Sequence, residues 1–172
     1  AVAQAAMDSG VATRPIEDFD AYRDRLNQFV YQSGFVMKPV FAAAKQAPRR
    51  IVYAEGEEER ILRAAQVVID ERIARPVLIG RPDVIQTRIE RLGLRLMRER
   101  DFELVDPDQD PRYREYWTEY HRLGARRGVT PEIAKLDMRR QPTLIGAMLL
   151  HMGEADAMVC GILGDYHRHL RF

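Results

Sequence analysis

Hydrophobic and polar positions change their spacing near residue 50, and this change divides the chain into two predicted parts. Before it, apolar residues recur at helical spacing, as in the stripe formed by Tyr22, Leu26, Phe29 and Val30. After it, short apolar runs alternate with longer amphipathic stretches. The alternation predicts an α/β fold with a mostly parallel sheet and helices on both faces, preceded by an α-helical N-terminal segment.

The N-terminal part is predicted to hold three helices. The first covers residues 1–7 and is stopped by Ser9-Gly10. The second has Asp18 as its N-cap and ends at Gly34. The third is short, rich in alanine and begins at Pro39.

A polar stretch with a proline, QAPRR at residues 46–50, is the best candidate for a linker. We therefore expect three parts along the chain. They are a helical segment over 1–34, a helical linker over 35–49 and the first part of an α/β domain over 50–172.

Within the α/β part, buried-type apolar runs predict strands at residues 51–54, 76–80, 102–105 and 157–160. Amphipathic stretches predict helices at residues 57–74, 82–92, 112–126 and 142–152. A further helix is predicted to start at Thr130-Pro131-Glu132, which supplies an N-cap, a proline at the first helical position and an acid in the first turn.

Bulk composition narrows the classes of partner. Apolar residues make up 46% and charged residues 31%, so a packed core is expected. The net charge of +1 gives no general signal for nucleic acid or for an anionic membrane, and we expect neither as a partner. No apolar run approaches the roughly 20 residues that span a bilayer.

The single cysteine and the chain ends carry further expectations. One cysteine excludes an internal disulfide and agrees with a reducing, cytoplasmic compartment. The sequence starts without methionine in a helix-compatible run, shows no basic leader or signal core, and stops at Phe172 without a polar tail. We expect a fragment of a longer polypeptide.

The stretch YAEGEEERILRAA at residues 53–65 has the strand, turn and helix order of a phosphate-binding turn. It holds one glycine, Gly56, and the carboxylates of Glu55, Glu57 and Glu58 flank it. Their charge would oppose a phosphate, so we predict no phosphate site here. The glutamates are predicted to cap and solvate a helix; binding of a hard cation is the alternative, and it would need further oxygens.

The segment after the last predicted strand is the better candidate for a ligand site. Ligands of open α/β sheets bind beyond the carboxyl ends of the strands. Glycines there let the backbone approach a ligand, and arginines bind phosphate. An ordinary strand-to-helix loop is the alternative. The candidate residues, for acetyl-CoA or phosphate, are Gly161, Gly164, Tyr166, His167, Arg168 and Arg171.

Four other features have structural interpretations. Cys160 is predicted to be a buried core residue, the alternative being a nucleophile served by a nearby histidine. His167 and His169 would share a face if extended, but two ligands do not complete a zinc site. The aromatic residues around Trp117 indicate core or subunit contact. Asp106, Asp108 and Asp110 match a calcium loop only in part.

Four blocks of sequence, in this order and spacing, resemble the first half of the phosphate acetyltransferase (phosphotransacetylase) family over residues 50–172. They are EGEEERILRAA (55–65), PVLIG (76–80), RRGVT (126–130) and GEADAMVCG (153–161). The segments SGVATRP (9–15) and LNQFVY (26–31) are similar to the C-terminal end of the NAD(P)-binding domain of bacterial malic enzymes. Together they indicate the hybrid, multidomain malic enzyme family.

This resemblance implies a parent enzyme that oxidatively decarboxylates malate to pyruvate, using NADP or NAD and a divalent metal, Mg²⁺ or Mn²⁺. The present segment would bind none of these. It would act in regulation, sensing acetyl-CoA, and in the assembly of a homo-oligomer.

The resemblance also has a departure. Where acetyltransferases carry a Gly-Ala-x-His-Ser/Thr-Thr type segment, this chain has GILGDYHRH at residues 161–169, without the pair of hydroxyls. The catalytic residues of both families would lie outside the segment, so no catalytic residue is expected in it. The alternative is an active phosphate acetyltransferase that forms acetyl phosphate from acetyl-CoA and phosphate.

Overall fold

The computed structural model describes residues 2–14, 16–30 and 34–172. The chain divides into two units, Ala1–Ala43 and Ala44–Phe172. The N-terminal unit contains α1 (Val2–Asp8) and α2 (Phe19–Val30), and α3 (Gly34–Gln46) runs across the boundary into the second unit.

Two of the predicted helix signals in the N-terminal unit are confirmed. Gly10, which follows α1, has a φ of 72°, the left-handed conformation that favours glycine after a helix. Asp18 caps α2, since its Oδ1 accepts hydrogen bonds from the backbone N–H groups of Asp20 at 2.9 Å and Ala21 at 3.0 Å.

The predicted boundary at Gly34 and the predicted start at Pro39 are wrong. Helix α2 ends at Val30, and α3 begins at Gly34 with Pro39 inside it. An internal proline removes one backbone hydrogen bond. The alanine-rich sequence after Pro39 favours the helix enough to offset that loss. Of the predicted apolar stripe, Leu26 is exposed, and the side chains of Phe29 and Val30 lie outside the described part.

The second unit is built on a four-stranded parallel sheet with the order β3-β2-β1-β4. The strands are β1 (Arg49–Tyr53), β2 (Ala74–Ile79), β3 (Glu103–Val105) and β4 (Ala157–Val159). The longer helices are α4 (Glu59–Asp70), α5 (Pro82–Arg91), α6 (Tyr113–Gly124), α7 (Pro131–Arg140) and α8 (Pro142–His151). A short 3₁₀ turn (Ala125–Arg127) follows α6, and α9 (Tyr166–His169) lies near the end. The predicted α/β class with a parallel sheet is confirmed.

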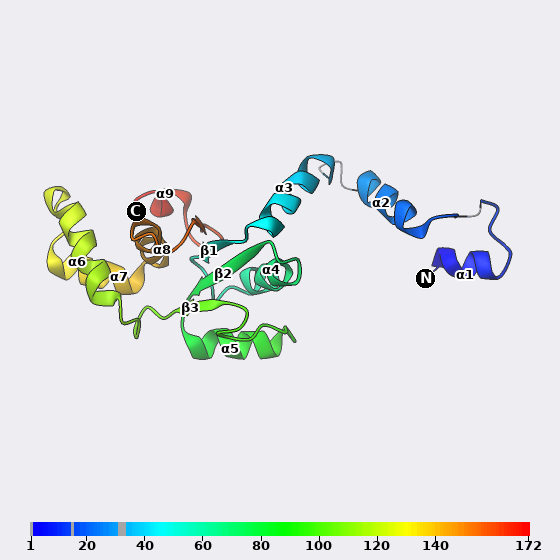
Figure 1. Cartoon of the computed structure of the whole chain (residues 1–172). Helices are drawn as coiled ribbons and strands as arrows, with labels where there is room; N and C mark the ends of the chain where they lie inside the picture. Colours follow the sequence, from blue (N-terminus) through cyan, green and yellow to red (C-terminus); the bar gives the residue numbers. More distant parts are fainter. Residues whose placement is uncertain (1, 15, 31–33) are drawn as a thin grey trace. The chain divides into compact units, whose positions relative to one another are not determined.

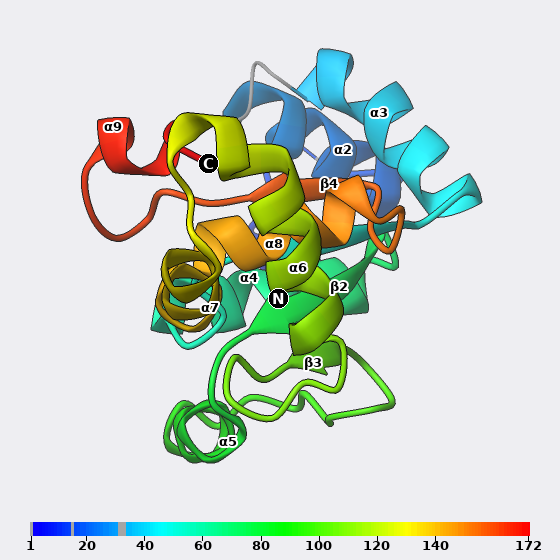
Figure 2. The same ribbon diagram turned by 90° about the vertical axis from the view of Figure 1, so that its left-hand side faces the viewer.

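Helices cover both faces of the sheet, because alternate strand residues point to opposite sides. Val52 and Val77 belong to a core with residues of α6, α7 and α8, whereas Tyr53 and Leu78 belong to a second core with residues of α4 and α5. Figures 1 and 2 show α6, α7 and α8 gathered on one side of the strands. The continuous apolar runs of β1 and β2 therefore reflect burial on both faces.

Helix ends differ most from the prediction. The helix expected over 57–74 covers only Glu59–Asp70, since Glu71 forms its C-cap and Arg72 adopts a φ of 56°. The helix expected over 112–126 stops at Gly124 and tightens into the 3₁₀ turn. The predicted start at Thr130 is confirmed: its side chain accepts the backbone N–H of Ile133 at 3.3 Å.

The aromatic stripe of α6 is part of the core, as predicted. Tyr116 is 2% exposed, and its hydroxyl donates a hydrogen bond to Glu154 Oε2 at 2.9 Å. Burial and this carboxylate raise the pKa of Tyr116 well above its ordinary value. Tyr113, Trp117 and Tyr120 pack against the same core. The stripe thus joins α6 to the sheet.

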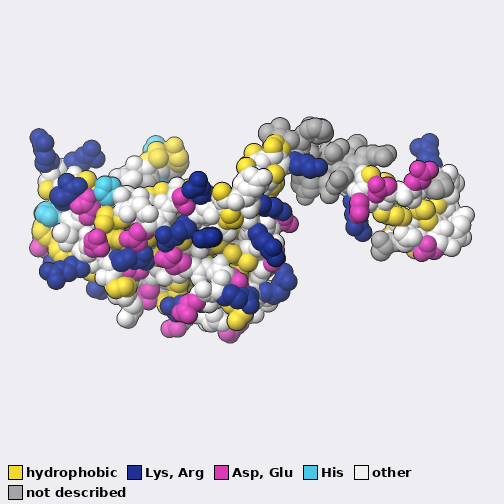
Figure 3. Space-filling view, in the orientation of Figure 1, with side chains coloured by type: hydrophobic (Ala, Val, Ile, Leu, Met, Phe, Trp, Pro, Cys, Tyr) yellow, Lys and Arg dark blue, Asp and Glu magenta, His cyan; other side chains and the backbone are white. Residues whose placement is uncertain are grey.

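The surface is mixed in charge. Figure 3 shows basic and acidic side chains interspersed over the face of the second unit that is in view. Among the described residues, no helix is both long enough and apolar enough to cross a membrane.

Candidate functional site

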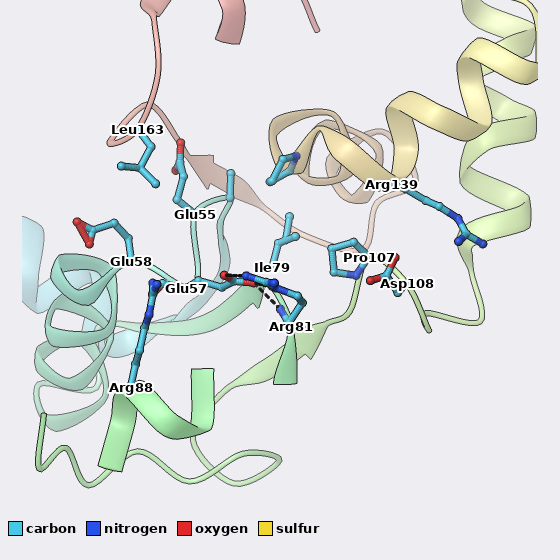
Figure 4. Close-up of a pocket in the computed structure, with 13 residues that line it drawn as sticks. Glu55, Glu57, Glu58, Ile79, Arg81, Arg88, Pro107, Asp108, Arg139 and Leu163 are labelled. Carbon is cyan, nitrogen blue, oxygen red and sulfur yellow. Dashed lines mark hydrogen bonds and ion pairs between the residues drawn. The ribbon is translucent and has the colours of Figure 1, made fainter. Parts of the chain in front are cut away.

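A cavity of about 330 Å³ lies at the carboxyl ends of the strands. It is bounded by the turns that follow β1, β2 and β3 and by the loop that follows β4, as shown in Figure 4. Its lining comprises Ala54, Glu55, Glu57, Glu58, Ile79, Gly80, Arg81, Arg88, Pro107, Asp108, Arg139, Pro142 and Leu163. In the order β3-β2-β1-β4, β2 and β3 lie on one side of β1, and β4 lies on the other. The strand order therefore reverses at β1, and open α/β sheets bind ligands at the carboxyl ends of the strands near such a reversal.

Glu57 and Arg81 join two of these turns. Oε1 of Glu57 accepts hydrogen bonds from the backbone N–H of Arg81 at 2.9 Å and from its Nε at 2.8 Å, and Oε2 accepts from Nη2 at 2.8 Å. Arg81 thereby lowers the pKa of the Glu57 carboxyl. The prediction that Glu57 caps a helix is wrong, because its side chain binds Arg81 in the turn that follows β2.

Glu58 and Glu59 behave as predicted. Glu58 is the N-cap of α4, and its side chain accepts the backbone N–H of Arg60 at 3.3 Å. Glu59 lies in the first turn, where its charge complements the helix dipole, and it pairs with Arg91.

Gly56 serves packing between strands. A Cβ atom at this position would lie 2.7 Å from the carbonyl oxygen of Ile79 and 2.9 Å from Cβ of Leu78. The backbone N–H of Gly56 donates to that same carbonyl at 3.0 Å. The glycine lets the turn approach β2, which explains a single glycine in place of a glycine-rich phosphate loop.

Glu55 reaches the other candidate segment. Its side chain is 9% exposed, and Oε1 accepts the backbone N–H of Gly161 at 2.8 Å. Within the described part of the chain, Oε2 is buried and has no hydrogen-bond donor. In Figure 4 the carboxylate points toward Leu163 and away from the pair formed by Glu57 and Arg81. Two motifs that lie about a hundred residues apart in sequence thus meet at one place.

The predicted ligand-binding residues all follow β4, and none of them is among the residues that line the cavity, to which this segment contributes Leu163. Gly161 and Gly164 adopt φ values of 98° and 93°, conformations that glycine tolerates best. Tyr166 is 69% exposed. The remaining three make local contacts: the backbone N–H of His167 donates to Asp165, Arg168 donates to Gln141 Oε1, and Arg171 lies by the Phe172 ring. Their role in binding stays a prediction.

His169 anchors this segment and was not among the predicted residues. Its Nδ1 lies 2.8 Å from Oγ1 of the buried Thr143, and its Nε2 lies 2.7 Å from the carbonyl oxygen of Leu163. Residues 166–169 form α9 instead of an extended segment, so His167 and His169 do not share a face. The sequence feature that could have predicted this short helix is Asp165, which is the N-cap of α9.

Cys160 is exposed, so the prediction of a buried core residue is wrong. Strand β4 is the edge of the described sheet and ends at Val159, one residue before the cysteine. Partial burial of the thiol and the charge of Glu55 raise the pKa of Cys160. A raised pKa leaves less thiolate, which makes this thiol a weak nucleophile.

The charges of the cavity do not suit a phosphate in its interior. Four acidic residues line it with three arginines. Arg81 is bound to Glu57, Arg88 donates to the Glu57 carbonyl, and the guanidinium of Arg139 lies over the Tyr113 ring at 4.7 Å. Within the described residues, no group of three or more metal-ligating side chains is found.

Curated malic enzymes match nearly the whole chain. An NAD-dependent malic enzyme of Rhizobium meliloti (strain 1021) is 59% identical over 99% of this chain and 22% of its own length. An NADP-dependent malic enzyme of Escherichia coli (strain K12) is 54% identical over 98% of this chain and 22% of its own length. The chain therefore spans about a fifth of the length of these relatives.

Phosphate acetyltransferases match about three quarters of the chain. That of Nitratidesulfovibrio vulgaris (strain Hildenborough) is 38% identical over 74% of this chain and 18% of its own length. The crystal structure of a phosphotransacetylase from Streptococcus pyogenes has the same fold, with a TM-score of 0.67 at 24% identity over 78% of this chain and 41% of that one. The family model described as Phosphate acetyl/butaryl transferase matches residues 35–172. With this fold and this match, the chain belongs to the phosphate acetyl/butaryl transferase family.

Proposed function

We propose that this chain is the phosphotransacetylase-like domain of a bacterial malic enzyme, which binds acetyl-CoA as an effector and helps the enzyme assemble. One observation carries the assignment to a malic enzyme. The acetyltransferase family model begins at residue 35, whereas malic enzymes match 98–99% of the chain and so include the helices before it.

The parent enzyme would convert malate to pyruvate with NAD or NADP and Mg²⁺ or Mn²⁺. The names of the relatives support the nicotinamide cofactor. The described part of this chain offers no cluster of metal-ligating side chains, so the metal would bind elsewhere in the parent. The single cysteine supports a reducing, cytoplasmic compartment.

An effector role, in preference to acetyl transfer, is supported by the chemistry at the carboxyl edge. Residues 161–169 lack the pair of hydroxyls that the acetyltransferase segment carries at this place. The thiol beside them, Cys160, has a raised pKa that disfavours nucleophilic attack. The edge nevertheless keeps a cavity and two glycines with left-handed backbone, which suit binding.

Calorimetric titration of the parent protein with acetyl-CoA tests the proposal, together with the rate of malate oxidation at rising acetyl-CoA concentration. We expect saturable binding and a changed rate. If acetyl-CoA neither binds nor alters the kinetics, the regulatory role is refuted.

Acetyl transfer to phosphate is the second candidate function, and the 38% identity to a phosphate acetyltransferase favours it. Formation of acetyl phosphate from acetyl-CoA and phosphate by the same parent protein separates the two. We expect a rate at background; a turnover above it would replace the effector role with catalysis.

Assembly is tested by light scattering. We expect the parent to be a homo-oligomer, and we expect deletion of residues 50–172 to lower the number of subunits per particle, calculated from the measured mass and the mass of the shortened subunit. A truncated protein that keeps the same number of subunits would show that this domain does not hold the subunits together.

A further inference from the structure

Glu55 has one carboxylate oxygen that the fold leaves unused. Oε1 accepts the N–H of Gly161 at 2.8 Å, but Oε2 finds no donor among the described residues although it is buried. The imidazole of His169 lies 3.9 Å from Oε1, beyond hydrogen-bond distance, and its Nε2 is bound to Leu163. Buried polar groups normally have a partner, so an orphaned oxygen calls for an explanation.

The neighbouring glutamates show that the unpaired oxygen of Glu55 does not result from a lack of hydrogen-bond donors around this turn. Glu57 accepts three hydrogen bonds from Arg81, Glu58 caps α4 and Glu59 pairs with Arg91. Each of these side chains has a structural partner. Glu55 is more buried than any of them, at 9% exposure, and is the one whose second oxygen remains open.

The position of the orphan points to a ligand. Glu55 lines the cavity at the carboxyl ends of the strands and lies directly under the loop from Gly161 to Leu163. That loop is fixed to the strand ends by the Glu55 to Gly161 bond and by His169. Because Oε2 is buried beneath this loop, a molecule in the cavity reaches it only when the loop moves.

The chemistry of the cavity limits which part of a ligand reaches Glu55. A carboxylate oxygen accepts hydrogen bonds, so its partner must be an N–H or O–H donor. Phosphate groups are acceptors and carry negative charge, and Glu55, Glu57 and Glu58 would repel them. The apolar wall formed by Ile79, Pro107, Pro142 and Leu163 suits an uncharged chain.

From this geometry we propose that Glu55 is a specificity-determining residue whose Oε2 accepts a hydrogen bond from an amide or hydroxyl group on the uncharged pantetheine arm of a coenzyme A thioester. The phosphates of the ligand lie outside the cavity. The inference rests on the proposed function, because it names the part of acetyl-CoA that this edge of the sheet recognises.

The test uses Glu55→Gln in the parent protein. Glutamine keeps an oxygen for the N–H of Gly161 and places an NH₂ donor where Oε2 stood. We expect acetyl-CoA to bind about tenfold more weakly, equivalent to about 1.4 kcal/mol. Adenosine 3′,5′-bisphosphate, which lacks the arm, should bind the variant and the wild type equally. Glu59→Gln removes the same charge from the first turn of α4, outside the cavity lining, and should change neither affinity by more than twofold.

The outcomes distinguish a failure of the proposed function from a failure of the role proposed for Glu55. If the wild type does not bind acetyl-CoA, the proposed function fails. If the wild type binds and Glu55→Gln binds equally well, or loses the bisphosphate to the same extent, the role of Glu55 alone is overturned. Competition on the wild type needs no variant: pantetheine should displace acetyl-CoA, and failure to do so at millimolar concentration contradicts the assignment of the arm.

Discussion

The turn from β1 to α4 and the loop from β4 to α9 meet at the same cavity, yet they are built in opposite ways. In the first, Gly56 is needed because a side chain would collide with β2. In the second, Gly161 and Gly164 are needed because their backbone is left-handed. A Cβ atom at Gly161 would meet no atom closer than 4.0 Å, whereas one at Gly164 would lie 3.3 Å from Nε2 of His169. The first turn is constrained by packing against β2, and the second by its backbone conformation and by the contacts of Glu55 and His169.

The largest loss of stability should come from Gly56→Ala. The added methyl would lie 2.7 Å from the carbonyl oxygen of Ile79, and backbone cannot yield as a flexible side chain does. We expect a loss of about 3 kcal/mol in unfolding free energy. Urea unfolding followed by the fluorescence of Trp117, the sole tryptophan, measures it. An unfolding midpoint equal to that of the wild type would show that β1 and β2 can separate at this turn.

Gly161→Ala should cost less, because only backbone conformation opposes it. The nearest atom to an added Cβ is Cδ2 of His169 at 4.0 Å, which is no clash. A φ of 98° costs an alanine about 1–2 kcal/mol. The same unfolding experiment applies. Gly161→Asn is the matched variant and should lose less, since asparagine tolerates this region better. Equal losses of unfolding free energy in Gly56→Ala and Gly161→Ala would contradict the difference between the two segments.

The contrast shows what the sequence could and could not predict. Apolar runs and helix caps are local, so the parallel sheet, its helices on both faces, and the caps at Asp18 and Thr130 followed from neighbouring residues. The end of α4 and the proline inside α3 did not, because competing local terms of similar size decide them.

The site was predicted only in part for a related reason. The edge of the sheet beyond β4 was foreseen from the rule for open sheets. The two contacts that define the site, Glu57 with Arg81 and Glu55 with Gly161, join residues 24 and 106 positions apart. Spacing along the chain does not reveal such pairs. Cys160 was misplaced because burial of a strand end depends on which strand lies next to it.

Glu57→Gln should have a smaller, pH-dependent effect. Because Arg81 holds the folded-state pKa of Glu57 below its unfolded value, the pair stabilises the fold above the unfolded pKa, about 4.3. This contribution is lost as pH falls through the folded value. We expect Glu57→Gln to lose about 1 kcal/mol at pH 7, since Arg81 is largely exposed and solvent screens the pair.

Unfolding free energies of the wild type and of Glu57→Gln, measured from pH 7 downward, check this expectation. The two curves should converge as Glu57 becomes protonated. A gap that stays constant into acid would mean that the glutamine disturbs packing and that the charge of Glu57 contributes nothing.

Arg168→Ala should have the smallest effect on stability, and it tests whether the loop after β4 binds anions. The arginine is exposed, and its one recorded side-chain hydrogen bond, to Gln141 Oε1, is long at 3.3 Å. We expect a change in unfolding free energy within about 0.5 kcal/mol.

If Arg168 contacts a phosphate of acetyl-CoA, affinity in the parent protein should fall about threefold, as for an exposed ion pair. Arg126→Ala removes the same charge from the exposed turn after α6 and serves as the control. Equal affinities in both variants would exclude Arg168 from the site and leave the contacts of Glu55 as the ones to pursue. A loss of affinity confined to Arg168→Ala would place a phosphate of acetyl-CoA beside the loop that follows β4.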